Sequence, residues 1–186
     1  RTIVADWLVR LRPYLADGEL RISTRSLADA VHDLQHGLAD FSILYHHPSL
    51  VVPLDGRQFE HVALATDRLL PVSRTDASGA PMYFLEAGCA PVPYIAYDRT
   101  LALGRLVEDL LAHHPLAAHL KRLVECDSPD ANYEYVRKGL GVSWLPWSVV
   151  HADVKSGLLA PAGAKGLEVK FDVRMFRPKR RLSALA

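Results

Sequence analysis

The chain has 186 residues, of which 49% are hydrophobic and 23% charged, and this composition is typical of a folded protein and not of a disordered one. Its net charge of +1 at pH 7 argues against a nucleic-acid-binding surface, which needs a basic field. Two cysteines are too few for a disulfide framework, which fits a reducing cytoplasm, and the sequence has neither a signal peptide nor an apolar run long enough to span a bilayer.

Helical and strand patterns alternate along the first half of the chain. Leu20 and Ile22 alternate with polar residues, which predicts a short strand. Ser26 is placed to cap the next helix, and Gly37 is placed to end it. The expected order is helix, strand, helix, strand, loop, strand and strand, over residues 3–15, 20–22, 26–37, 40–45, 46–56, 59–65 and 69–73.

The second half continues the alternation. Ser128 followed by Pro129 is the favoured order at the start of a helix. The expected order is strand, helix, strand, helix, strand, helix, strand and strand, over residues 94–97, 102–112, 120–126, 128–138, 142–145, 147–154, 158–161 and 167–176. Such alternation predicts an α/β fold with parallel sheets and helices on both faces.

The most informative segment is VRKGLGVSWLP, residues 136–146. Gly139 suits the left-handed position that ends many helices, and Gly141 lets the backbone approach closely at the head of a strand that Pro146 closes. A helix that leads into a tight strand is half of a parallel α/β unit. In such units small ligands bind beyond the carboxyl ends of the strands.

This segment resembles the "G-x-G, hydrophobic run, proline" motif in the effector-binding domain of LysR-type transcriptional regulators. Three more segments resemble motifs of that family in the order that the family requires: the unit of Leu34, Gly37, Asp40 and Phe41, then SGLLAPA, then MFRPKRRLS. The resemblance runs through nearly the whole chain. Four further short segments also resemble sequences of the subgroup that responds to hypochlorite: YHHP, PLDG, DRLLPVS and AYDRTLALGR.

The resemblance implies two Rossmann-like lobes joined by two crossovers, the type 2 periplasmic-binding-protein-like fold. Lobe I would comprise residues 1–68 plus 165–186, and lobe II residues 69–164. Two departures from the family are expected. The strand that normally precedes the first helix is missing, and so is the winged helix-turn-helix that reads DNA, so this chain alone should not bind operator DNA.

The sequence offers little support for catalysis. His32 and His36 share one helical face, but Asp33 stands where metalloproteases have glutamate, and no third ligand is evident, so we expect no metal. No serine-nucleophile elbow and no Walker loop occur. Gly139-x-Gly141 precedes a strand instead of following one, which excludes a dinucleotide fingerprint. We predict a protein that is not an enzyme and has no cofactor.

The better functional signal is a set of helix starts at strand ends, where free backbone N–H groups and the helix dipole favour anions. The alternative is that the serines and threonines there cap only their own helices, and that the aromatic residues pack in the core. Adjacent His46 and His47 follow a strand and should point to opposite faces. The effector-binding candidates are Thr24, Arg25, Ser26, His46, His47, Tyr97, Thr100, Gly104, Asp127, Ser128 and Trp144.

An oxidant sensor would need an oxidisable sulfur, and oxidation of methionine makes an apolar side chain polar. Met175 shares an alternating pattern with apolar neighbours, so strand packing is the alternative for it, whereas Met82 and Cys89 lie in a predicted loop. The redox candidates are Met82, Met175, Cys89 and Cys126.

The leading hypothesis is the effector-sensing and dimerising domain of a bacterial LysR-type regulator in the cytoplasm. A small, anionic effector would bind in the interlobe cleft, or an oxidant would be the signal. The resemblance implies homodimers, tetramers of the full-length protein, DNA contact only through the missing N-terminal domain, and no membrane partner. The alternatives are a solute-binding protein of a transport system with the same two-lobe fold, and a transferase or synthase on that fold.

Overall fold

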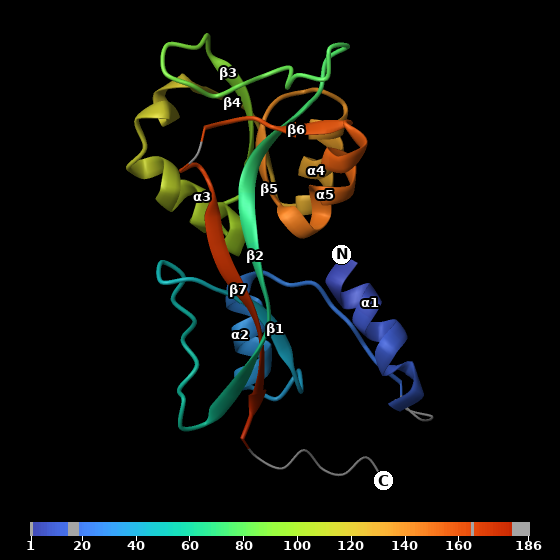
Figure 1. Cartoon of the computed structure of the whole chain (residues 1–186). Helices are drawn as coiled ribbons and strands as arrows, with labels where there is room; N and C mark the ends of the chain where they lie inside the picture. Colours follow the sequence, from blue (N-terminus) through green and yellow to red (C-terminus); the bar gives the residue numbers. More distant parts are fainter. Residues whose placement is uncertain (1, 15–18, 165, 180–186) are drawn as a thin grey trace.

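The computed structural model describes residues 2–14, 19–164 and 166–179 (Figure 1). Five α-helices are present in this part of the chain: α1 (Thr2–Leu11), α2 (Leu27–Gln35), α3 (Ala102–Ala112), α4 (Pro129–Arg137) and α5 (Trp147–Ser156). Seven strands accompany them: β1 (Ser42–His46), β2 (Phe59–Arg74), β3 (Val92–Tyr97), β4 (Leu120–Cys126), β5 (Ser143–Pro146), β6 (Leu159–Pro161) and β7 (Val169–Pro178). Short 3-10 helices span Arg12–Tyr14 and Pro115–His119. The predicted α/β class is confirmed.

The antiparallel pair of β2 and β7 runs through most of the length of the molecule (Figure 1). The pairing extends from Phe59 opposite Pro178 to Leu69 opposite Val169, with a register shift between Ala63 and Ala65. β1 pairs with the free side of β7, while β5 and β6 pair with β2, and every one of these pairs is antiparallel. One five-stranded sheet therefore continues from one end of the molecule to the other.

Two clusters of buried side chains lie along this sheet and define the two lobes. The smaller, in lobe I, forms where α2 covers one face of β1, β2 and β7. Its members are Leu27, Val31, Leu34, Leu44, Phe59 and Phe176. The larger, in lobe II, surrounds the fully buried Trp144 and is enclosed by α3 on one side and by α4 and α5 on the other (Figure 1). The division of the chain at residues 68 and 165 stays a prediction.

Parallel pairing is confined to lobe II. There β3 pairs with β4, and Tyr94 bridges Val142 just before β5. The prediction of parallel sheets throughout is therefore wrong for the main sheet. The two predicted strands at 59–65 and 69–73 are a single strand, β2, because β7 pairs with them continuously past Asp67 and Arg68.

The strand predicted at Leu20 and Ile22 does not form. Residues 19–26 belong to no ladder, and Leu20 and Ile22 remain 48% and 55% exposed. A strand needs a neighbour for its N–H and C=O groups, and none of the described residues pairs with this segment. The helix predicted over residues 3–15 is α1 and the short 3-10 helix that follows it, up to residue 14, and residue 15 lies outside the described residues.

Two glycines end α4 and start β5 as predicted. Gly139 has a φ of +79°, its N–H donates to the carbonyl of Val136 at 2.9 Å, and the N–H of Leu140 donates to the carbonyl of Tyr135 at 3.1 Å. These bonds form a Schellman motif. At Gly141 a methyl group would lie 2.5 Å from the carbonyl oxygen of Pro93, so only glycine allows this approach to β3.

We therefore expect Gly141→Ala to lower the free energy of unfolding by about 2–3 kcal/mol, because the methyl group must displace backbone. Urea denaturation followed by circular dichroism measures the change. Gly56→Ala is the matched control, since a methyl group at Gly56 would meet no atom within 4 Å. Equal stability of the two variants would contradict the close packing of β3 and β5.

Candidate functional site

The lobe junction is formed by the carboxyl ends of β3 and β4 and by the starts of α3 and α4. Tyr97 lies opposite Cys126 in the parallel register, so both strands end at the same edge. The N–H of Asp98 extends this pairing by donating to the carbonyl of Cys126 at 2.9 Å. Ala102, the first residue of α3, packs against the buried clusters of both lobes. The start of α3 therefore lies where lobe I meets lobe II.

The start of α3 has no side-chain cap. Its N-cap residue is Leu101, whose side chain cannot accept a hydrogen bond. Thr100 does not replace it, because its hydroxyl and its N–H both donate to Asp98 Oδ1, at 2.6 and 2.7 Å, and these bonds lower the pKa of Asp98. The first N–H groups of α3 are thus left to solvent or to a ligand, and the helix dipole favours an anion there.

Close packing sets the position of α3. A methyl group on Gly104 would lie 2.3 Å from the carbonyl oxygen of Asp98, so glycine lets the first turn of the helix approach the end of β3. Arg99 and Arg105 flank this turn, and Arg105 Nε donates to the carbonyl of Arg99 at 3.2 Å. The turn therefore has two cationic residues, Arg99 and Arg105, beside the carboxylate of Asp98, and Arg99 Nη2 also lies 3.9 Å from Glu108 Oε2.

The start of α4 is capped. Ser128 Oγ accepts a hydrogen bond from the N–H of Ala131 at 3.3 Å, with Pro129 at the first helical position. The N–H of Ser128 itself donates to Cys126 Sγ at 3.4 Å. A cysteine sulfur therefore lies at this helix start, next to the end of β3.

Two buried polar atoms near the junction have no hydrogen-bond partner among the described residues: Tyr97 Oη and Asn132 Oδ1. Burial raises the pKa of Tyr97 well above its usual range, so the phenol stays protonated and remains a donor. Asn132 uses its Nδ2 on the carbonyl of Ala96 at 3.3 Å and on Ser143 Oγ at 3.4 Å. Buried polar groups are normally paired, so a ligand or a water molecule is the expected partner.

Lobe I contributes Tyr45 to the junction. Its ring meets Phe171 edge to face at 4.8 Å, and it packs against the buried cluster of lobe II. Burial, with a smaller contribution from the nearby carboxylate of Asp67, raises the pKa of Tyr45. Its hydroxyl, like that of Tyr97, is therefore neutral at physiological pH.

Asp67, in the middle of β2, caps α5 from a distance. The N-cap residue of α5 is Pro146, which makes no side-chain cap bond. Asp67 instead accepts hydrogen bonds from Ser148 Oγ at 2.6 Å and from the N–H of Ser148 at 3.3 Å. Next to it, Arg68 lies over the ring of Trp147 at 4.9 Å. These contacts attach β2, the strand that runs through both lobes, to α5 in lobe II.

A charged cluster crosses the three strands of lobe I. Asp172 accepts a hydrogen bond from Arg174 Nη2 at 2.8 Å and lies 3.9 Å from His46 Nδ1, while Arg174 Nη1 lies 3.3 Å from His61 Nε2. Burial and the Arg174 charge lower the pKa of His46, although Asp172 opposes this. His46 and Arg174 therefore share one carboxylate, and His61 contacts this cluster through Arg174.

The other predicted effector residues are dispersed. Ser26 caps α2 by accepting from the N–H of Asp29 at 3.1 Å, and Thr24, Arg25 and Asp127 are exposed. Arg25 Nε pairs with Asp33 at 3.5 Å. Tyr97, Thr100, Gly104 and Ser128 come together at the junction, and the exposed Asp127 lies beside them, between Cys126 and Ser128.

Two more candidates have structural partners. His47 Nδ1 bonds Ser49 Oγ at 2.7 Å, within its own turn. Trp144 is fully buried, its ring meets Tyr94 edge to face, and its Nε1 donates to the carbonyl of Leu167 at 2.7 Å. Core packing, the alternative considered for Trp144, leaves its ring no exposed surface.

Sequence reasoning missed Tyr45, Asp67 and Asn132. The signal for Asp67 was present, since Asp67 and Arg68 stand between two apolar stretches, residues 62–65 and 69–72. A buried Asn132 has no local signature. Of the sulfur atoms, Met82 is 46% exposed, and Met175 and both free cysteines are partly buried. Among the described residues, no group of histidine, cysteine and acidic side chains could hold a metal ion, and no helix is long and apolar enough to cross a membrane.

Known proteins share this fold. The family model for the LysR substrate binding domain matches residues 1–186. The HTH-type transcriptional regulator YjiE of Escherichia coli (strain K12) is 24% identical over 158 residues, which are 85% of this chain and 50% of YjiE. Full-length HypT from Salmonella typhimurium, a hypochlorite-specific LysR-type transcriptional regulator, gives a TM-score of 0.80 at 23% identity, over 95% of this chain and 59% of HypT. The bromide-ion-bound regulatory domain of HypT gives a TM-score of 0.77 at 23% identity, over 95% of this chain and 84% of that domain.

A two-lobed α/β domain whose lobes share one antiparallel strand pair, with helix starts at their junction, is an effector-binding domain of the type 2 periplasmic-binding-protein-like class. This chain belongs to the LysR substrate-binding domain family, which serves transcription regulators and not enzymes. It spans half the length of YjiE. The likeness to the HypT structures, at 23% identity, shows the fold alone.

Removing the Asp67 carboxylate should destabilise the domain by about 1–2 kcal/mol, the usual effect of losing a helix cap. We expect Asp67→Ala to show this loss in urea denaturation and Asp67→Asn to show a smaller one, because an amide oxygen still accepts from Ser148. The exposed Asp109→Ala is the control. Unchanged stability of Asp67→Ala would mean that the bonds to Ser148 do not hold α5.

The stability of the domain should depend on His46 below neutral pH. Because the folded pKa of His46 lies below its unfolded value of about 6.5, the unfolded chain binds more protons between the two values, and stability is lost as pH falls through that window. Melting temperatures between about pH 7 and pH 5 should therefore fall less in His46→Gln than in the wild type. The exposed His113→Gln should follow the wild type, and identical curves for all three proteins would refute the role of His46.

Proposed function

We propose that this chain is the effector-sensing and oligomerisation domain of a bacterial LysR-type transcriptional regulator, and that a small anion is its effector. The anion would bind at the lobe junction, against the uncapped start of α3. The observation that carries this proposal is the absence of a side-chain cap at Leu101 in a helix whose first residue packs against both lobes.

The electrostatics of the junction favour a negative ligand. The N–H groups of the first turn of α3 point out of the helix start, and Arg99 and Arg105 flank them. Ser128 begins the neighbouring helix, and Tyr97 supplies a buried neutral hydroxyl without a partner among the described residues. Because lobe I contacts the same helix start, an anion there would favour one arrangement of the lobes over another.

The anion proposal has support from a relative. A structure of the regulatory domain of HypT carries a bromide ion, and HypT itself is described as hypochlorite-specific. For this chain we extend the proposal to halides and to their oxidised forms. Oxidant sensing is a second candidate function, favoured by Cys126, whose sulfur lies at the start of α4 beside the proposed anion site.

The properties of the whole protein follow from the family and are part of the proposal. LysR-type regulators bind DNA through an N-terminal domain and assemble as oligomers. We accordingly propose a homodimer for this domain, a tetramer for a full-length protein, and a location in the cytoplasm.

Thermal unfolding against a panel of halides and small carboxylates tests the effector site. We expect a saturable rise in melting temperature with one class of anion, since a ligand at 100 times its dissociation constant adds about 2.7 kcal/mol. Leu101→Asp should abolish the rise, because the new carboxylate caps α3 and repels anions. Leu123→Asp, at a 56% exposed position of β4, is the matched control and should retain it.

A rise that persists in Leu101→Asp would contradict binding at the start of α3, and Ser26→Ala would then test the start of α2. A panel without any rise, together with stoichiometric oxidation by dilute hypochlorite of one sulfur before the other three, would favour oxidant sensing. The oxidised sulfur would be identified by mass spectrometry among Met82, Met175, Cys89 and Cys126.

A further inference from the structure

A cavity of about 630 Å³ lies in lobe II where α4 and α5 end, whereas the lobe junction lies where α4 begins. Its lining comes from the end of β2, from the segment after the turn at residues 76–80, and from the last turns of the two helices. We call it the distal cavity, and the lining residues that matter below are Arg74, Thr75, Met82, Lys138, Gly157 and Leu158.

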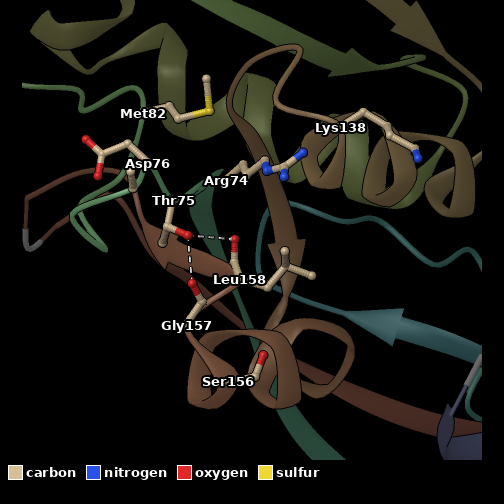
Figure 2. A pocket seen from close by; sticks show the side chains of 9 residues that line it. Arg74, Thr75, Asp76, Met82, Lys138, Ser156, Gly157 and Leu158 are labelled. Carbon is tan, nitrogen blue, oxygen red and sulfur yellow. Dashed lines mark hydrogen bonds between the residues drawn. The ribbon is translucent and has the colours of Figure 1, made fainter.

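Hydrogen bonds cross-link the floor of the distal cavity. The hydroxyl of Thr75 donates to the carbonyl of Gly157 at 2.7 Å and to that of Leu158 at 3.2 Å, and the N–H of Thr75 donates to the same Leu158 carbonyl at 3.1 Å. Figure 2 shows these two hydroxyl bonds joining the end of β2 to the end of α5. The bonds hold the floor in place without filling the space above it.

Met82 and Arg74 form the wall over the glycine turn that ends α4. A methyl group placed on Gly139 would lie 3.2 Å from Met82 Sδ and 3.5 Å from Arg74 Cδ, so both side chains pack on that turn. Met82 is 46% exposed, and its N–H donates to the carbonyl of Arg74 at 2.8 Å. In Figure 2 the guanidinium of Arg74 lies above Leu158 and extends from the Met82 side of the cavity towards Lys138.

The charge of the distal cavity is positive. The lining has two cationic side chains, Arg74 and Lys138, and one carboxylate, Asp76, so its net charge is positive. Asp76 Oδ1 accepts from Ser78 Oγ at 2.6 Å, from the N–H of Ser78 at 2.8 Å and from the N–H of Ala80 at 3.2 Å. These bonds lower the pKa of Asp76, so it keeps its negative charge while its Oδ1 is bound within its own turn. Arg74 donates to the carbonyl of Arg137 at 3.3 Å, and a guanidinium carries five donors. No other hydrogen bond of the Arg74 guanidinium is found among the described residues, so its other donors are left to solvent or to a ligand.

We propose that the distal cavity is a second ligand site, for a small carboxylate with a short apolar tail. The guanidinium of Arg74 would bind the carboxylate through charge-assisted hydrogen bonds, and the tail would lie against Met82 and Leu158. The amine of Lys138, which points away in Figure 2, adds charge at longer range. The distal cavity is wide open to solvent, so a ligand there would be only partly buried. This site does not depend on the effector site proposed at the lobe junction.

The two methionines of the sequence make a direct experiment possible. In the chain labelled with ¹³C at the methionine methyl groups, Met82 and Met175 give separate NMR signals, and Met82→Leu identifies which is which. Titration with hexanoate should shift the Met82 signal saturably and leave the Met175 signal in place. Inorganic phosphate, which has no apolar tail, should bind more weakly.

Arg74→Gln should weaken the binding of hexanoate about tenfold or more, because a charge-assisted hydrogen bond is lost. Lys138→Gln, which leaves the bond from Arg74 to Arg137 intact, should weaken it less, and Lys121→Gln, an exposed lysine on β4, should have no effect. The proposal is overturned if the Met82 signal does not shift saturably, if Arg74→Gln binds as the wild type does, or if phosphate binds as tightly as hexanoate.

Discussion

The rest of the structure depends on the antiparallel pairing of β2 with β7. Both connections between the lobes are neighbouring strands of one sheet, so backbone hydrogen bonds, and not flexible linkers, join lobe I to lobe II. The pairing also places side chains. β2 positions Asp67 at the start of α5. β7 positions Asp172 next to His46 and Arg174 next to His61. Any change in the arrangement of the lobes must twist or shear this pair.

Local sequence patterns predicted the parts of the fold that local physics determines. Ser26 and Ser128 cap the helices that their positions indicated, and Gly139 and Gly141 make the turn and the close approach that only glycine permits. The direction of strand pairing could not be predicted in this way. It is set by contacts such as that of Thr66 with Asp172, which are 106 residues apart along the chain, and no local pattern contains that information.

The candidate site was predicted only in outline, for a related reason. The helix starts after β3 and β4 were found because residues that can cap a helix follow the predicted strands. The hydroxyl of Thr100 had suggested hydrogen bonding to a ligand, yet the structure commits it to Asp98 and leaves the backbone of α3 as the open group. Whether such a hydroxyl bonds a ligand or a neighbouring side chain depends on distances in the folded chain, which the sequence does not give. Asp67 and Asn132 act across the fold, so their roles appear only when distant segments meet.

The place of β7 in the sheet also determines the order in which the chain can assemble. β7 is the last described strand, yet it lies between β1 and β2, so lobe I has no continuous sheet until β7 has been synthesised. The parallel strands and helices of lobe II are complete earlier and can fold as the chain emerges from the ribosome. Until then the backbone edges of β1 and β2 stay unpaired, and this interval is when a chaperone would matter most.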